Sequence, residues 1–71
     1  MEFSGKVVRI PVSGGSWGIE GDDGQQYRPV NGIPKKYQTA GARVRVRAEA
    51  VQGMDIFMWG RQISISSIQE G

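Results

Sequence analysis

Hydrophobic and polar residues alternate most regularly between residues 42 and 50. One set of alternate positions holds Ala42, Val44, Val46, Ala48 and Ala50; the other holds Arg43, Arg45, Arg47 and Glu49. Successive side chains of a β-strand point to opposite faces, so this segment is predicted to be a strand with an apolar inner face and a charged outer face. A shift of one residue would bury three arginines, and the register is therefore strongly fixed.

A second alternating segment, Lys6–Val12, is predicted to be the first strand. One face is expected to carry Val8, Ile10 and Val12, and the other Val7 and Arg9. Pro11 has no N–H to donate to a ladder, so it is expected at an edge or a bulge. The glycine- and serine-containing run of residues 13–16 then turns the chain.

A β-hairpin is predicted around Asp22-Asp23-Gly24, because Asp and Gly tolerate the positive φ values that tight turns require. In the strand before this turn, Trp17 and Ile19 share one face. Residues 25–29 return as the partner strand, with Tyr27 on one face and Gln26 and Arg28 on the other.

A short helical turn is expected after the hairpin. Pro34 suits a first helical turn and Gly41 suits its end. Ile33, Tyr37 and Ala40 recur at helical spacing and are predicted to cover one end of the fold.

Two further extended segments follow residue 50. Met54–Trp59 is apolar on both sides and is expected to be a strand or an extended crossing. In Gln62–Ile68, Ile63 and Ile65 share a face and Ile68 falls out of phase. A β-bulge near Ser66-Ser67 would return Ile68 to that face.

This order predicts a single all-β domain over residues 1–71. The expected architecture is a small five- (or six-) stranded OB-like barrel with a short helical turn after strand three, since closure removes exposed strand edges. An SH3-like barrel is the alternative. Eleven glycines, spread along the chain, provide the turns.

Composition limits the chemistry. The chain has no cysteine and no histidine, so the commonest catalytic bases and metal ligands are missing. Three carboxylates lie close together in the sequence, at Glu20, Asp22 and Asp23. They lack the spacing of a calcium-binding loop and indicate a turn instead. We expect no enzyme, no metal, no cofactor and no membrane segment, and a cytoplasmic location. The net charge of +2 is too small to decide between partners.

Several motifs resemble cold-shock domains, which are OB-fold proteins that bind single-stranded nucleic acid on aromatic side chains. The matching residues are Gly5-Lys6-Val7, Gly15-Ser16-Trp17-Gly18-Ile19, Asp22-Asp23-Gly24, Tyr27 and the later segment Gly41–Val46. The chain is more closely similar to short uncharacterised prokaryotic OB-like proteins. That likeness lies in Trp17-Gly18-Ile19, Asp23-Gly24, Tyr27-Arg28-Pro29, Asn31, Met58-Trp59-Gly60 and Ile63.

The chain departs from the cold-shock pattern at its aromatic positions. Trp17 matches the first exposed Phe of the family motif, Ile19 replaces the second, and Glu20 stands where a buried Ile is expected. Because Glu20 is not readily buried, Trp17 and Ile19 are predicted to turn inward. The resemblance therefore supports the fold more than the nucleic-acid function.

Two functions are consistent with the sequence. The first is a non-enzymatic binding module for single-stranded nucleic acid or another polyanion. Its candidate binding residues are Arg43, Arg45, Arg47, Arg9, Arg28, Lys35, Lys36 and Tyr27. In the simpler interpretation the arginines are solvated and pair with Glu20, Glu49 or Asp55, and Trp17 and Tyr27 belong to the core. The second function is a protein-interaction or structural module, with a protein partner or a second copy bound through Met54–Trp59.

Overall fold

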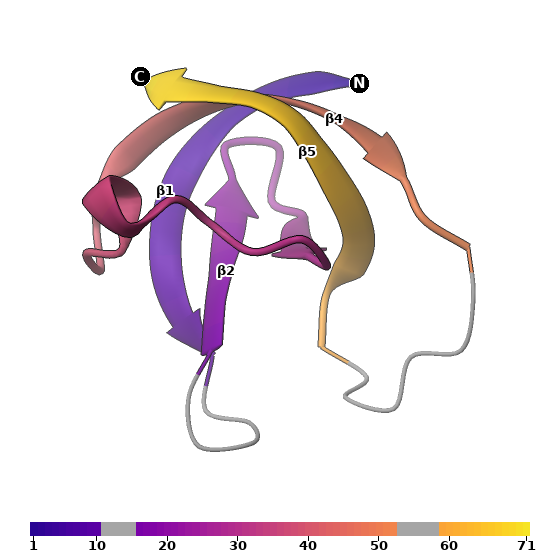
Figure 1. The fold of residues 1–71 in the computed structure, drawn as a ribbon, viewed down its shortest axis with the longest axis horizontal. Coiled ribbons are helices and arrows are strands. Elements are labelled where there is room, and N and C mark those ends of the chain that lie inside the picture. Colours follow the sequence, from indigo (N-terminus) through magenta and orange to yellow (C-terminus); the bar gives the residue numbers. More distant parts are fainter. Residues whose placement is uncertain (11–15, 53–58) are drawn as a thin grey trace.

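The computed structural model describes residues 1–10, 16–52 and 59–71 and forms an all-β closed barrel (Figure 1). Its elements are β1 (Glu2–Ile10), β2 (Ser16–Gly21), β3 (Gln26–Pro29), the 3₁₀ helix η1 (Lys35–Tyr37), β4 (Arg43–Ala50) and β5 (Arg61–Glu70). The barrel order is β1-β2-β3-β5-β4, with β4 closing onto β1. The predicted small OB-like barrel with a short helical turn after the third strand is confirmed.

Strand direction separates the two barrel types that the sequence left open. β3 and β5 are parallel and pair over three residues, from Tyr27 opposite Arg61 to Pro29 opposite Ile63. All other pairings are antiparallel. A parallel β3–β5 pair and a β1–β4 closure are the connections of an OB-like barrel, so the structure does not adopt the SH3-like alternative.

The barrel interior is apolar. The core cluster is Val7, Ile19, Tyr27, Ile33, Tyr37, Val44, Val46, Ala48 and Ile63, and Phe3, Trp17, Ala42, Ile65 and Ile68 pack against it. In β4 the predicted alternation is confirmed, since Val44, Val46 and Ala48 are buried between exposed arginines. Ala50, expected on the inner face, is exposed at the end of the strand.

The first strand divides its side chains between two faces as predicted, and the face of Val7 is the inner one. Val7 lies opposite the inward Ile19 and belongs to the core, whereas Val8 is half-buried. Ile10 is also fully buried, but outside the core cluster. A Cβ at Gly18 on the outer face would meet Trp59 and the Cδ1 of Ile10, so a small apolar layer covers this outer face. Both faces of β1 are apolar, and the alternation therefore did not identify the inner one.

Val12, Pro11 and the run 13–15 lie outside the described residues, as does most of the predicted extended segment Met54–Trp59. Trp59 itself is described: it is half-buried and belongs to no strand. The predictions made for the undescribed positions stay predictions.

The hairpin between β2 and β3 is confirmed. Gly24 has a φ of +83° and its N–H donates to the carbonyl of Gly21 at 3.0 Å. The Gly21 N–H donates to the Gln25 carbonyl at 2.8 Å, which closes the turn. The Asp23 carboxylate accepts the Gln25 N–H at 2.9 Å and so fixes the turn from within.

The helical turn is shorter than the segment over which the sequence shows helical spacing. η1 spans three residues after Pro34 and brings Tyr37 into the core beside Ile33, and both side chains are buried. Ala40 is exposed, which corrects the prediction that it covers the barrel. The helix ends at Tyr37, so the helical spacing does not extend to residue 40.

The predicted bulge in the last strand is confirmed at Ser66. Ile65 lies opposite Ala48 and Ser67 lies opposite Arg47, so Ser66 is the additional residue. Its hydroxyl donates to the Arg47 carbonyl at 3.0 Å. The insertion returns Ile68 to the inner side, where it packs against the core.

Candidate nucleic-acid interface

The arginine row, defined here as Arg43, Arg45 and Arg47, lies on the outer face of β4. Its side chains are 52%, 53% and 67% exposed. Alternate residues of a strand are about 6.6–7 Å apart, so the three Cα atoms form a regular line between β1 and β5. The outward orientation predicted from the alternation is confirmed.

Each arginine of the row has a carboxylate partner. Asp22 contacts Arg43 at 2.7 Å, and Glu2 bridges Arg45 at 3.4 Å and Arg47 at 2.9 Å. The predicted partners were different acids. Glu20 contacts Lys6 at 3.9 Å instead, and Asp55 lies outside the described residues.

These pairings follow from the barrel closure. The β1–β4 register places Glu2 directly opposite Arg47 and Ser4 opposite Arg45. The Asp22 N–H donates to the Ser4 carbonyl at 2.9 Å, which fixes the hairpin turn beside the same strand. Residues distant in sequence therefore meet at the row, and no local pattern reveals this.

The ion pairs change the protonation equilibria of the acids. The Arg47 guanidinium, with a smaller contribution from Arg45, lowers the pKa of the Glu2 carboxyl. A hydrogen bond from Arg43 lowers the pKa of the Asp22 carboxyl, and the same contact raises the pKa of Arg43. Both carboxylates are therefore charged at neutral pH.

The two lysines of η1 extend the positive charge beyond Arg43. Lys36 and Arg43 line the same open pocket of about 380 Å³, together with Tyr37, Glu70 and the carboxyl-terminal Gly71. The Lys36 ammonium lies 5.0 Å from the centre of the Tyr37 ring. Lys35 is exposed in the same turn.

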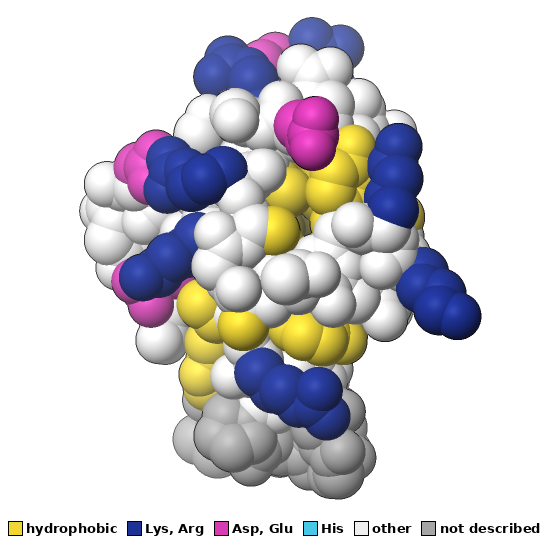
Figure 2. Space-filling view, turned by 90° about the vertical axis from the view of Figure 1, so that its left-hand side faces the viewer, with side chains coloured by type: hydrophobic (Ala, Val, Ile, Leu, Met, Phe, Trp, Pro, Cys, Tyr) yellow, Lys and Arg dark blue, Asp and Glu magenta, His cyan; other side chains and the backbone are white. Residues whose placement is uncertain are grey.

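Two predicted binding arginines lie away from the row. Arg9 is at the far end of β1, where its guanidinium lies 5.3 Å from the centre of the Trp17 ring. Arg28 is half-buried on β3, which β5 separates from β4. Figure 2 shows dark blue Lys and Arg side chains dispersed over one face, with magenta acidic side chains beside several of them.

Of the aromatic candidates, Tyr27 belongs to the core and the half-buried Trp17 packs against it. Tyr27 is 5% exposed and stacks on Phe3, with ring centres 4.1 Å apart. Its hydroxyl donates to the Asp23 carboxylate at 2.8 Å, and burial together with this contact raises the pKa of Tyr27. The prediction of Tyr27 as a binding residue is therefore wrong, because no base can reach its ring. Trp17 packs against the core, as its inward orientation predicted.

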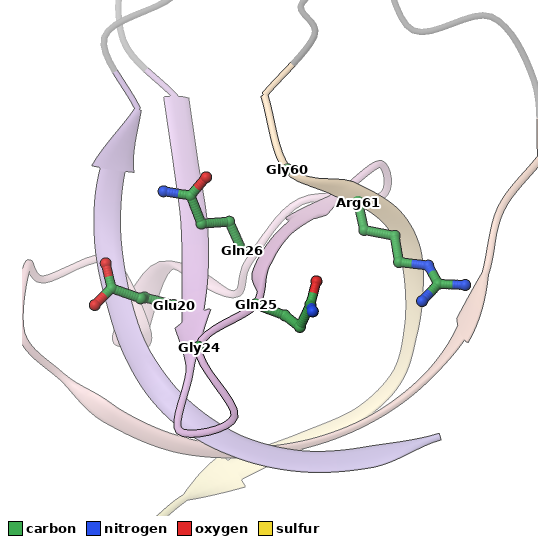
Figure 3. Close-up of a pocket in the computed structure, with 6 residues that line it drawn as sticks. All are labelled: Glu20, Gly24, Gln25, Gln26, Gly60 and Arg61. Carbon is green, nitrogen blue, oxygen red and sulfur yellow. The ribbon is translucent and has the colours of Figure 1, made fainter.

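Arg61 was not among the predicted binding residues. Arg61 is exposed at the start of β5, and within the described part of the chain it makes no ion pair. It lines an open pocket of about 580 Å³ with Gly24, Gln25, Gln26, Glu20 and Gly60. Figure 3 shows Glu20 and Gln26 directed to one side and Arg61 to the other, so these groups do not converge on one ligand position.

Within residues 1–10, 16–52 and 59–71, no group of three acidic side chains is placed to hold a metal ion. None of the helices in the same residues has the length and apolar character to cross a membrane. Comparisons with protein-family models, curated proteins and solved structures give no match. The resemblances noted in the sequence therefore stay predictions.

Proposed function

We propose that this chain is a non-enzymatic module that binds single-stranded nucleic acid, or a similar polyanion, along the arginine row. The observation that carries the proposal is the line of three outward guanidinium groups on one rigid strand. Because they lie on one β-strand, the guanidinium groups are regularly spaced and can contact successive phosphates of a nucleic-acid backbone. Such contacts position a ligand without reading its sequence, so weak and sequence-tolerant binding is expected.

The carboxylates beside the row do not prevent this role. All of these ion pairs are largely exposed, and exposed ion pairs contribute little to stability. Two carboxylates pair with the three guanidinium groups, and Glu49 adds an exposed carboxylate next to Arg47, so binding requires that the ligand displace the paired carboxylates. A phosphodiester chain offers several anionic groups at once and so replaces the carboxylates collectively.

The test compares two charge-matched double variants. Arg45→Gln/Arg47→Gln removes two charges from the row, and Arg9→Gln/Arg61→Gln removes two charges elsewhere. Affinity for a twelve-nucleotide mixed DNA strand is measured by fluorescence anisotropy across a salt series. Single strands give a slope of roughly −0.7 per neutralised phosphate, so the row variant is expected to flatten the log–log slope by about 1.4.

The control variant is expected to leave the slope nearly unchanged. Both variants are expected to keep the wild-type melting curve, since exposed substitutions change stability by about 0.5 kcal/mol or less. Absence of wild-type binding at low salt would overturn the proposal. Equal slopes for the two variants would show that the row is only a solvated face.

A further inference from the structure

We infer that Glu2 and Asp22 set the ligand selectivity of the arginine row, acting as tethered competitors that a chain of linked phosphates displaces and a single anion does not. This inference rests on the proposed function. It assigns a role in binding to two residues that carry the same sign of charge as the ligand.

The contacts support a competitive role. The Arg47 Nη2 donates to one Glu2 oxygen at 2.9 Å, and the Arg45 Nη2 donates to the other at 3.4 Å. The Arg43 Nη2 donates to Asp22 at 2.7 Å. A phosphate would use these same guanidinium N–H groups, because carboxylate and phosphate match the same fork geometry. Ligand and carboxylate are therefore alternatives at each arginine.

Both carboxylates are held in place by backbone contacts. Glu2 is a residue of β1 and pairs with Arg47 in the β1–β4 ladder. Asp22 is fixed by its N–H bond to the Ser4 carbonyl at 2.9 Å. A tethered group acts at a high effective concentration, which a free monovalent anion must exceed to replace it.

Linked phosphates meet this requirement and isolated ones do not. A single phosphate that replaces Glu2 exchanges the ion pairs of Glu2 with Arg45 and Arg47 for its own contacts to the same arginines and gains little. A nucleic-acid strand that binds all three arginines breaks their ion pairs with the two carboxylates. In return it makes several phosphate contacts for a single loss of translational freedom. It also releases condensed counterions, a gain that an isolated phosphate lacks.

Glu49 provides a matched control for charge. It is an exposed carboxylate on the same outer face of β4, next to Arg47 along the row. Glu49 forms no ion pair with any of the described residues. Glu49→Gln therefore makes the same change in net charge as Glu2→Gln without freeing an arginine.

The experiment compares Glu2→Gln, Asp22→Asn and the double variant with Glu49→Gln, after thermal melts confirm that each is folded. The first readout is affinity for the twelve-nucleotide strand at fixed salt. Exposed ion pairs of this kind correspond to factors of up to about five in an equilibrium constant. Glu2→Gln and Asp22→Asn are each expected to raise affinity by a few-fold more than Glu49→Gln.

The second readout is binding of inorganic phosphate, followed by the amide shifts of residues 43–47. Millimolar phosphate is expected to move these signals in the double variant and to leave them unmoved in the wild type and in Glu49→Gln. Phosphate binding to the wild-type row would overturn the inference. So would equal oligonucleotide affinities for Glu2→Gln, Asp22→Asn and Glu49→Gln.

The two proposals fail in different ways. If the wild type binds the oligonucleotide through the row and the acid variants match the control, the selectivity role fails and the function stands. If neither the wild type nor the double variant binds the oligonucleotide at low salt, the row has no polyanion function and the inference fails with it.

Discussion

Replacing Gly5 by Ala tests the packing between β1 and β2 on which the barrel depends. Gly5 is buried and pairs with Gly21 on β2 and with Val44 on β4. A Cβ at this position would meet the backbone carbonyl oxygen of Glu20 and would lie 2.9 Å from the Cα of Gly21. These atoms belong to the neighbouring strand, so no side-chain rotation relieves the contact. The strands themselves must move apart.

The expected loss of stability is large for a domain of this size. Inserting a methyl group into a packed core costs about 1–3 kcal/mol, and the upper end applies where backbone obstructs it. A chain of 71 residues has a total stability of roughly 4–10 kcal/mol. A loss of about 3 kcal/mol would lower the melting temperature by roughly 12–24 °C.

The measurement is thermal and urea unfolding of Gly5→Ala beside Gly18→Ala. At Gly18 the added Cβ would lie 2.5 Å from the Cζ3 of Trp59 and 2.7 Å from the Cδ1 of Ile10. Both obstacles are outer ends of side chains, which can shift, so a smaller loss is expected. Gly5→Ala with a wild-type melting temperature, or Gly18→Ala as the less stable of the two, would refute the reasoning.

Three further predictions concern local contacts. The Gln25 N–H and, to a smaller extent, the Tyr27 hydroxyl keep the pKa of Asp23 below its usual value, and Tyr27→Phe removes the second of these contacts. In the wild type this contribution is present at neutral pH and is lost as the pH falls through the lowered pKa of Asp23. The difference in stability between neutral and strongly acidic pH, measured by urea unfolding, should therefore be smaller for Tyr27→Phe. Deleting Ser66 removes the extra residue but leaves Ser67 opposite Arg47 and Ile68 opposite Val46, so Ile68 stays on the inner side and the urea midpoint should fall less than it does for Ile68→Ala; a larger fall would contradict the register. Gly24→Val places a β-branched residue at a φ of +83° and should lose about 1 kcal/mol or more in thermal melts.

The sequence predicted the fold wherever one pattern had a single interpretation. The β4 alternation admits one register, and the phase change between Ile65 and Ile68 requires an additional residue, which the structure places at Ser66. The inner face of β1 was not predictable in this way. Val7 and Val8 are equally apolar, and only the pairing of Val7 with Ile19 selects the first.

The charged contacts were less predictable than the strands. The outward orientation of the row follows from alternation, but its partners depend on how the barrel closes. Glu2 reaches the row across the β1–β4 ladder, and Asp22 reaches Arg43 from the hairpin turn. The burial of Tyr27 likewise depends on Phe3 of another strand. Each of these contacts joins residues that no local spacing relates.

The polar groups of the described residues lie mainly on the outer surface of the barrel. Among the described residues, no charged side chain is buried as a whole, although the Nε of the half-buried Arg28 is not exposed. Tyr27 is buried, and its hydroxyl is already bonded to Asp23. An interior filled by Val44, Val46 and Ile63 provides no group with which to recognise a polar ligand. The alternation that builds this core places a charge at every second position of β4 on the outside. The same pattern that makes the barrel stable therefore presents the arginine row on the outer surface.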